Sequence, residues 1–261
     1  MTVVCYLDDS DGQQSSVATL AGYIATVEGW QHYESHSRAV YDTYRVGDLL
    51  HAKEFQGGKT PFRQWSWPKR LSFIDALFEG PWVQWGVAVS ISKREFAEIK
   101  NGPGVGPNMS PYGLAFSIIL HTLVRGTPLG GLIQAAGLEI VVEDGHRNNG
   151  DIARCFEASK RAEVYAPVLR AIGFATKKSC RALHLADLLA FYSRRRHSME
   201  SAHPTLRIPK HAVLAKITQK VPHTSRLIRR GGTVSEAAEP TAGDSSWLPV
   251  PLWAAPARRG S

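Results

Sequence analysis

The sequence predicts an α/β fold of three layers, in which helices cover both faces of a mixed β-sheet. Three observations lead to this prediction. Short apolar runs typical of buried strands alternate with longer segments typical of helices. The first two predicted strands are joined by a loop alone, which favours an antiparallel hairpin. Helices separate the later strands, which favours parallel pairing. We expect a sheet of five strands.

The strands are predicted from short runs of apolar residues. The first and fourth runs are continuously apolar and end in acids, as expected of central strands that are buried on both faces. The third run alternates apolar and other side chains, which is the pattern of a strand with two different faces. The five predicted strands are residues 3–7, 20–26, 82–92, 138–142 and 174–178.

The helices are predicted from apolar faces and from end signals. Pro68 suits the first turn of the second helix, and Asp151 suits the start of the fifth. Gly173 is expected to end the fifth helix, and Ser179 is a plausible N-cap for the last. The six predicted helices are residues 30–44, 65–78, 93–100, 111–124, 149–172 and 181–196.

The length of 261 residues suits one large domain with an extension. We expect residues 1–230 to form this domain, with a basic C-terminal segment at 193–230. Residues 231–261 are rich in Ala, Pro, Gly and Ser and lack a periodic pattern. They are predicted to form a disordered tail.

Several sequence features suggest a cytoplasmic protein without a membrane span. The N-terminal residues lack the basic start of a signal peptide. The most apolar stretch, residues 116–124, is too short to cross a bilayer. Three widely spaced cysteines, Cys5, Cys155 and Cys180, form no CxxC pair, which favours a reducing compartment.

Positive charge is concentrated near the C-terminus. The net charge of the chain is +8, and residues 193–230 hold ten Lys or Arg against Glu200, so the rest of the chain sums to −1. A concentrated basic region favours a polyanion such as nucleic acid as partner. A solvated basic surface is the alternative, and charge alone leaves both open. The oligomeric state is also left open.

Acidic residues stand at three places that suggest a shared site. Asp8 and Asp9 end the first predicted strand, and Glu143 and Asp144 end the fourth. Asp187 lies inside the last predicted helix. Because ligands in open α/β sheets bind beyond the carboxyl ends of strands, neighbouring strands would bring two of these acids together. A helix packed across that edge would add Asp187.

Clustered carboxylates need a cation, because they repel one another. Mg²⁺ or Mn²⁺ prefers oxygen ligands, and a pair of such ions activates water and stabilises the leaving oxygen of a phosphodiester. Asp8 is the stronger candidate on its strand, because alternation sends Asp9 to the other face. The same alternation allows only one of Glu143 and Asp144 to face the site. Acids that merely open turns are the alternative reading.

Asp187 is the most informative single acid, because its helix is otherwise strongly apolar. An unpaired buried carboxylate is costly, so a function would explain it. An exposed helix stripe or an arginine partner would explain it equally. His184 lies three residues earlier on the same helical face, where a packing or orienting role is favoured over metal ligation.

Two further histidines lie near the candidate acids. His51 and Glu54 are one helical turn apart and could orient a water or a phosphate, although the spacing is not HExxH and implies no zinc protease. The start of a surface helix explains them equally. His146 could act as an acid–base group, or simply occupy a turn.

At these residues the chain resembles the bacterial domain-of-unknown-function family 3800, which is regarded as RNase H-like. The resemblance covers roughly residues 3–200. It implies an RNase H-like sheet with Asp8, Glu143 and Asp187 as its acidic centre. The chain departs from the family by having Asp9 in place of Glu and His184 in place of Gln. The matching segments are Tyr6-Leu7-Asp8-Asp9-Ser10, residues 20–25, His51-Ala52-Lys53-Glu54-Phe55, Val141-Val142-Glu143 with Gly145-His146 and Asn149-Gly150-Asp151, and Leu183-His184-Leu185-Ala186-Asp187-Leu188-Leu189-Ala190.

The leading hypothesis is a metal-dependent nuclease. Asp8, Glu143 and Asp187 would bind Mg²⁺ or Mn²⁺, with proton transfer assisted by His146 or His51. The phosphate backbone of DNA or RNA would lie on basic side chains, namely Lys178, Arg194, Arg195 and Arg196. Two alternatives stay open. One is a non-catalytic nucleic-acid-binding or adaptor module on the same fold, and the other is a hydrolase of a small phosphorylated molecule.

Overall fold

A computed structural model shows a seven-stranded mixed sheet with the strand order β5-β4-β1-β2-β3-β6-β7. It describes residues 1–10, 15–100, 108–203, 205, 208–229 and 232–237. The strands are β1 (Val3–Ser10), β2 (Val17–Thr26), β3 (Trp85–Ser92), β4 (Leu138–Glu143), β5 (Leu169–Ala175), β6 (His223–Arg229) and β7 (Gly232–Ala237).

The pairing of the strands confirms the predicted α/β fold with a mixed sheet. β1, β2 and β3 form an antiparallel meander, and β4 and β5 extend it in parallel from β1. On the other side, β6 pairs parallel to β3 and antiparallel to β7. Gly22 in β2 allows the close approach to β1, since a Cβ there would lie 1.7 Å from the carbonyl oxygen of Tyr6.

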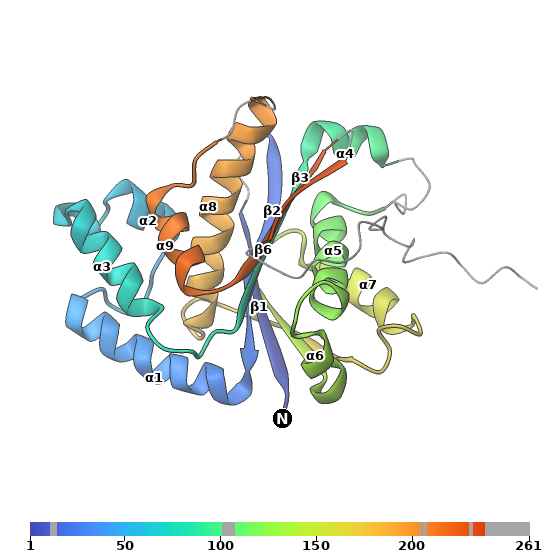
Figure 1. The fold of residues 1–261 in the computed structure, drawn as a ribbon, viewed down its shortest axis with the longest axis horizontal. Coiled ribbons are helices and arrows are strands. Elements are labelled where there is room, and N and C mark those ends of the chain that lie inside the picture. The colour runs from blue at the N-terminus through green and yellow to red at the C-terminus, as the bar shows by residue number, and fades with distance from the viewer. Residues whose placement is uncertain (11–14, 101–107, 204, 206–207, 230–231, 238–261) are drawn as a thin grey trace, which may run out of the picture.

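Helices cover both faces of the sheet, so the predicted three layers are present (Figure 1). α1, α2, α3, α8 and α9 lie on one side, and α5, α6 and α7 lie on the other. The helices are α1 (Val27–Tyr44), α2 (Ala52–Gly57), α3 (Trp67–Leu77), α4 (Lys93–Ile99), α5 (Pro111–Arg125), α6 (Gly130–Ala136), α7 (Asn149–Lys160), α8 (Ala182–Ala202) and α9 (Ala212–Lys220), with a 3₁₀ turn η1 (Phe62–Gln64) between α2 and α3.

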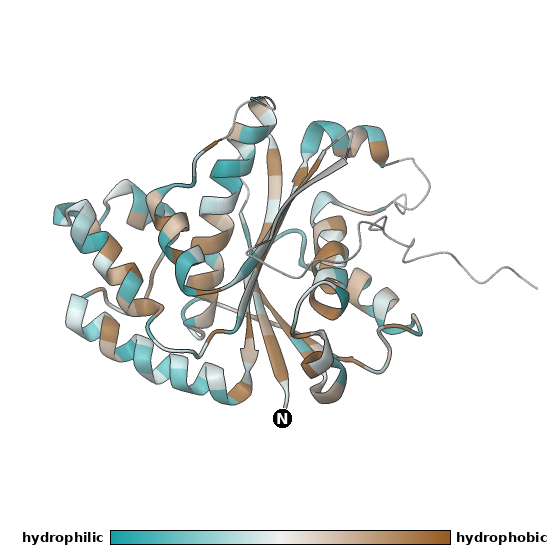
Figure 2. Ribbon diagram, in the orientation of Figure 1, coloured by the Kyte–Doolittle hydropathy of each residue, from teal (hydrophilic) through white to brown (hydrophobic). Residues whose placement is uncertain are grey.

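A separate apolar core fills the space on each side of the sheet. Apolar residues gather on the strands and on the inward faces of α5 and α8, and hydrophilic residues gather on the outer faces (Figure 2). α8 packs directly on β1 and β2, burying Leu185, Leu188 and Leu189. Within the described residues, no single helix is long and apolar enough to cross a membrane, although α5 and α6 together, bent by 93°, reach that length and composition.

The prediction was wrong about the end of the fifth helix and the position of the fifth strand. The helix predicted at 149–172 ends at Lys160, and β5 occupies Leu169–Ala175 instead of 174–178. Tyr165 and Val168, in the turns between them, are buried and bring the chain back to the sheet. β5 is an edge strand with mostly exposed or half-exposed side chains, so it lacks the apolar run of a buried strand.

The sheet also has two strands more than the five expected. β6 lies within the predicted basic segment, and β7 lies within residues 231–261, the predicted disordered tail. The tail prediction is therefore wrong for 232–237, and residues 238–261 lie outside the described residues. β7 is held by main-chain pairing along the edge of β6. Main-chain hydrogen bonds do not require an apolar sequence, so composition misled the prediction.

Candidate metal centre

Three parallel strands end at the same edge of the sheet and bring together residues far apart in sequence. β1 ends beside β4, and β4 ends beside β5. Glu143 pairs with Ala175, and Lys177 lies two residues beyond it, so alternation sends both side chains to the same face. α8 crosses that face and contributes Asp187 from its second turn. Asp8 completes the group from β1.

The three predicted metal ligands converge on one point, and the ammonium nitrogen of Lys177 lies at that point. Its Nζ lies 2.8 Å from Oδ2 of Asp8, 2.6 Å from Oε2 of Glu143 and 3.8 Å from Oδ1 of Asp187. All three carboxylates thus lie well within the roughly 10 Å that a pair of metal ions about 4 Å apart allows. The structure therefore brings Asp8, Glu143 and Asp187 together as one cluster.

A buried histidine, His184, hydrogen-bonds to the main chain of Lys177. Nε2 of His184 donates to the carbonyl of Lys177 at 2.9 Å, and Nδ1 accepts from the hydroxyl of Tyr41 at 2.7 Å. Burial lowers the pKa of His184 to about 4, so the ring is neutral, and its two partners place the proton on Nε2. Both ring nitrogens are occupied, so His184 orients the lysine and is not placed as a metal ligand.

His146 forms a second cationic contact beside the first. Its Nδ1 lies 2.7 Å from Oδ1 of Asp9, and its Nε2 lies 3.0 Å from Oε2 of Glu143 and 3.8 Å from Oδ1 of Asp8. Hydrogen bonds with Asp9 and Glu143 raise the pKa of His146 to about 10. Ligand atoms of Asp8, Asp9 and His146 all lie within 4.8 Å of one another. Asp9 therefore belongs to the cluster, although it leaves β1 on the face opposite Asp8.

Asp8 is the acid of the cluster whose charged form is most disfavoured by burial. It is 0% exposed, and among the described residues neither of its carboxylate oxygens accepts a well-oriented hydrogen bond. Burial, followed by the contact with Glu143 and the charge of Asp187, raises the pKa of Asp8 well above its usual range. Burial also acts against the charge of Glu143, but hydrogen bonds to His146 and Lys177 hold its pKa well below normal.

The balance of charges in the cluster would favour a divalent cation. Four carboxylates face two cations, so the group carries a negative excess even with both cations charged. Burial opposes the charge on Lys177, but Asp187 and Asp8 raise its pKa above normal, so the lysine stays charged. The donors are carboxylate oxygens, which Mg²⁺ or Mn²⁺ accepts, and His146 could join them only after losing its proton. The ammonium of Lys177 lies at the point where Asp8, Glu143 and Asp187 converge, so an ion bound there would displace it.

The structure decides between the two acids that end β4. Glu143 points into the cluster, whereas Asp144 is exposed and its Oδ1 accepts a hydrogen bond from the amide of Gly145. It also shows which of two neighbouring lysines enters the cluster. Lys178 is exposed, and its neighbour Lys177 is the one that enters the site. The alternation from Glu143 through Ala175 was the signal that would have identified Lys177.

α2 begins at the cluster and places His51 next to Asp187. The amide of Ala52 donates to Oδ2 of Asp187 at 2.8 Å, and Nδ1 of His51 lies 3.7 Å from the same oxygen. The contact with Asp187 is the largest of the effects that raise the pKa of His51, and the negative charge of Glu54 is the smallest. Glu54 lies one turn further along α2 and is half-buried. His51 is half-exposed, so it lies at the mouth of the cluster.

The three consecutive arginines of α8 do not form a single phosphate-binding strip. Arg194 donates from Nε to the hydroxyl of Ser10 at the end of β1, Arg195 is exposed beside the ring of Phe191, and Arg196 pairs with Glu200. Successive residues on a helix point about 100° apart, so the three diverge. Of the three arginines, Arg194 is nearest to Asp187 along α8, seven residues beyond it.

Other charges of the predicted basic segment are also engaged elsewhere. Lys216 and Lys220 both pair with Asp75 on α3, and Arg226 is largely buried, which lowers its pKa. Arg207 and Arg230 lie outside the described residues. The segment at 193–230 is therefore distributed over α8, α9 and β6, and it does not form one continuous basic surface in the described part of the chain.

No match to this chain is found among models of protein families, among curated proteins or among solved structures.

Proposed function

We propose that this protein is a divalent-metal-dependent hydrolase of nucleic-acid phosphodiesters, built on an RNase H-like sheet of the type suggested by the resemblance to family 3800. The observation that carries the proposal is the convergence of Asp8, Glu143 and Asp187 on one cation position at the carboxyl edge of β1 and β4. The five adjacent strands β3-β2-β1-β4-β5, a hairpin joined to parallel strands, support the RNase H-like part.

Asp8, Glu143 and Asp187 would hold Mg²⁺ or Mn²⁺, and Asp9 would offer an adjacent ligand atom. Such an ion supplies activation of water and stabilisation of charge on the leaving oxygen. The burial of Asp8 supports the assignment, because the cluster holds more acids than cations and a metal ion would stabilise buried carboxylates.

Side chains around the acids supply the proton transfer and the charge that hydrolysis requires. His146, charged between Asp9 and Glu143, is placed to give a proton to the leaving oxygen. His51, at the half-exposed mouth of the site, is placed to orient the attacking water. Lys177 would supply a positive charge to a phosphate oxygen once a metal ion took its place among the carboxylates.

Cleavage assays on purified protein test the proposal. We expect labelled DNA or RNA to be cut in Mg²⁺ or Mn²⁺, to be left intact in EDTA, and to be left intact by Asp8→Asn. Calorimetry should show that Asp8→Asn also loses binding of Mn²⁺. The proposal is overturned if the wild-type protein neither binds Mn²⁺ nor cuts any single- or double-stranded substrate.

One observation favours a second candidate, a non-catalytic nucleic-acid-binding module. Lys177 and His146 already neutralise part of the acidic charge, as they would in a purely structural ion-pair cluster. In that case binding of nucleic acid would be unchanged by EDTA and by Asp187→Asn, and no cleavage would accompany it. The same purified protein distinguishes the two candidates.

A further inference from the structure

The chain segment that leaves the acidic cluster forms a projecting ledge. Residues 51–70, here called the α2–α3 ledge, comprise α2, η1 and the start of α3. Its first residues touch the cluster, through the amide of Ala52 and the ring of His51, which both contact Asp187. α2 then runs outward for six residues, roughly 9 Å at 1.5 Å per residue. The ledge therefore begins at the site, and α2 and α3 lie on the same side of the sheet as α8 (Figure 1).

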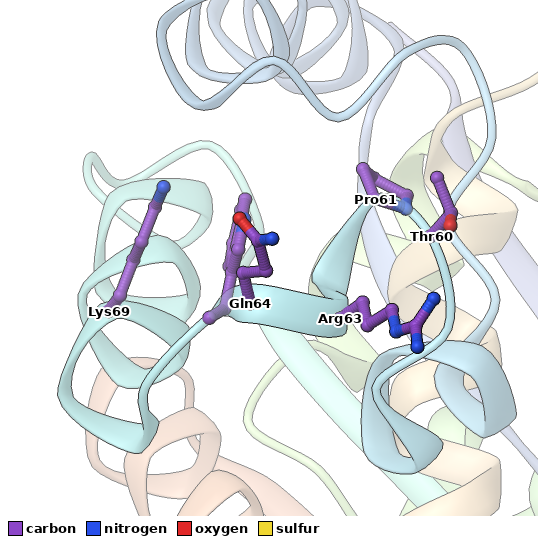
Figure 3. Close-up of a pocket in the computed structure, with 6 residues that line it drawn as sticks. Thr60, Pro61, Arg63, Gln64 and Lys69 are labelled. Atoms are coloured by element: carbon purple, nitrogen blue, oxygen red, sulfur yellow. The ribbon is translucent and has the colours of Figure 1, made fainter.

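The ledge contains a hollow of about 400 Å³ that polar and basic side chains line. In Figure 3, Gln64 and Lys69 point the same way from neighbouring turns, and Arg63 lies on the other side with the Thr60–Pro61 loop. The size falls within the range of about 300 to 1,000 Å³ typical of small-molecule sites. One nucleotide therefore has room there.

The ledge is strongly basic over its whole length. It holds five Lys or Arg against one acid, Glu54, which leaves a net charge of +4 when its histidine is neutral. Four of these five cations are exposed, whereas Arg70 is buried. A net charge of +4 thus lies in 20 residues beside the acidic cluster. The exposed cations are Lys53, Lys59, Arg63 and Lys69.

Aromatic rings stand among these cations. Trp65 is half-buried in the lining of the hollow, with the ammonium of Lys69 located 4.5 Å from its ring centre. Trp67 is 43% exposed, an unusual position for a large apolar side chain. Because Lys69 is flexible and exposed, a base can replace it over Trp65 while its ammonium moves to a phosphate. Rings interleaved with cations are typical of sites for single-stranded nucleic acid.

A buried arginine holds the ledge rigid. The guanidinium of Arg70 donates to the carbonyls of Gln56, Phe62 and Trp65, at 3.2, 3.1 and 3.3 Å, and also to that of Phe55. These four carbonyls come from α2, η1 and the turn before α3. The hollow is therefore fixed before any ligand arrives, which lowers the entropic cost of binding.

We propose that the α2–α3 ledge binds a single-stranded segment of nucleic acid, with phosphates on Arg63 and Lys69 and one base on Trp65. This inference rests on the proposed function, because the ledge that carries the hollow begins at His51 and Ala52, which contact Asp187 of the acidic cluster. A duplex would offer phosphates but not an unstacked base, and so would leave Trp65 unused. Exposed polar groups at Thr60 and Gln64 offer hydrogen bonds to the edge of the base.

Fluorescence anisotropy in EDTA tests this separately from catalysis. The probes are a labelled 12-nucleotide DNA strand, the RNA of the same sequence, and the corresponding duplexes. We expect single strands to bind more tightly than duplexes. We expect Arg63→Ala with Lys69→Ala to weaken single-strand binding about tenfold or more, and to reduce the slope of log K against log salt by about 1.4, at about 0.7 per phosphate contact. Arg94→Ala, an exposed arginine on α4 across the sheet, is the matched control.

Trp65→Phe provides a second variant that keeps a ring in the core. Tryptophan quenching by the single strand should fall in this variant while its melting temperature stays near that of wild type. The inference is overturned if the double variant binds single strands like Arg94→Ala, or if duplexes bind as tightly as single strands and lose as much affinity. Failure of the proposed function looks different, since cleavage would then be absent while ledge variants still weakened binding in EDTA.

Discussion

The ammonium nitrogen of Lys177 lies 2.8 Å from a carboxylate oxygen of Asp8, and both side chains are almost wholly buried. Glu143 and Asp187 approach the same nitrogen from β4 and α8. One lysine thus contacts all three acids. Its removal leaves those acids facing one another without this counter-charge, and the first prediction follows from that.

Lys177→Ala should lower the free energy of unfolding by about 3 kcal/mol in EDTA at neutral pH, because it leaves buried carboxylates without their partner. Mn²⁺ should restore more of the stability of this variant than of wild type, since the ion then meets no competing ammonium. Urea denaturation with and without Mn²⁺ measures both effects. Lys178→Ala, the exposed neighbour, should change stability by no more than about 0.5 kcal/mol. Equal stability of the two variants would show that Lys177 is not the counter-charge.

Glu143→Gln should weaken Mn²⁺ binding and slow cleavage at least about 100-fold, because a metal ligand matters more than the outer partners whose loss costs about 10- to 100-fold. Asp144→Asn is the matched control, since that acid is adjacent but exposed and bonded to the amide of Gly145. It should stay close to wild type. Calorimetry and a cleavage assay measure the two effects, and similar losses in both variants would contradict the assignment of Glu143.

Stability should fall as the pH drops from about 6.5 to 4 because of His184. The folded protein keeps this ring neutral, with a pKa of about 4, whereas the unfolded chain protonates it near 6.5. Below pH 6.5 His184 therefore binds a proton in the unfolded state but not in the folded state. This proton binding lowers the free energy of the unfolded state relative to the folded state. At pH 5 the loss is about 2 kcal/mol.

His184→Gln isolates this effect from the titration of the acidic cluster, because glutamine can still donate to the carbonyl of Lys177 but does not titrate. The free energy of unfolding of the two proteins, measured between pH 4 and 8, should converge or cross as the pH falls. Parallel curves over this range would show that His184 does not carry the pH dependence.

Arg70→Ala should destabilise the protein by about 3 kcal/mol, because four main-chain carbonyls lose a charged donor in a buried place. Lys69→Ala, its exposed neighbour, should cost less than about 1 kcal/mol, mainly through the lost contact with Trp65. Thermal or urea unfolding compares the two. Single-strand binding should respond in both variants, but only Arg70→Ala should weaken binding through loss of structure.

Part of the candidate site could be predicted because strand alternation is a local property. The apolar run before Asp8 and the run before Glu143 indicated two buried strands ending in acids, and Asp187 stood out in an apolar helix. Alternation also limited each acidic pair to one inward residue. It could not show which residue of the second pair this was, because the last paired position of β4 depends on β5.

The rest of the site depended on contacts between distant segments. Lys177 enters the cluster because β5 ends at Ala175, whereas the sequence predicted a strand that ends three residues later, at 178. Asp9 reaches His146 around the edge of the sheet, a contact that no spacing reveals. The arginines of α8 diverge because of helical geometry, whereas the basic charge beside the site comes from the α2–α3 ledge.

The sequence by itself determined the α/β class, the central strands and the acids at their ends. A strand that is buried on both faces is a continuous apolar run, and such a run is visible in the local sequence. Only the tertiary structure decided the edge strands β5 and β7, the added strand β6, the choice of Glu143 over Asp144, and the place of Lys177 among the acids. Edge strands are held by main-chain hydrogen bonds, which leave little trace in side-chain composition. The pairing of charges depends on which strand ends meet, and that is fixed only when the whole sheet has formed.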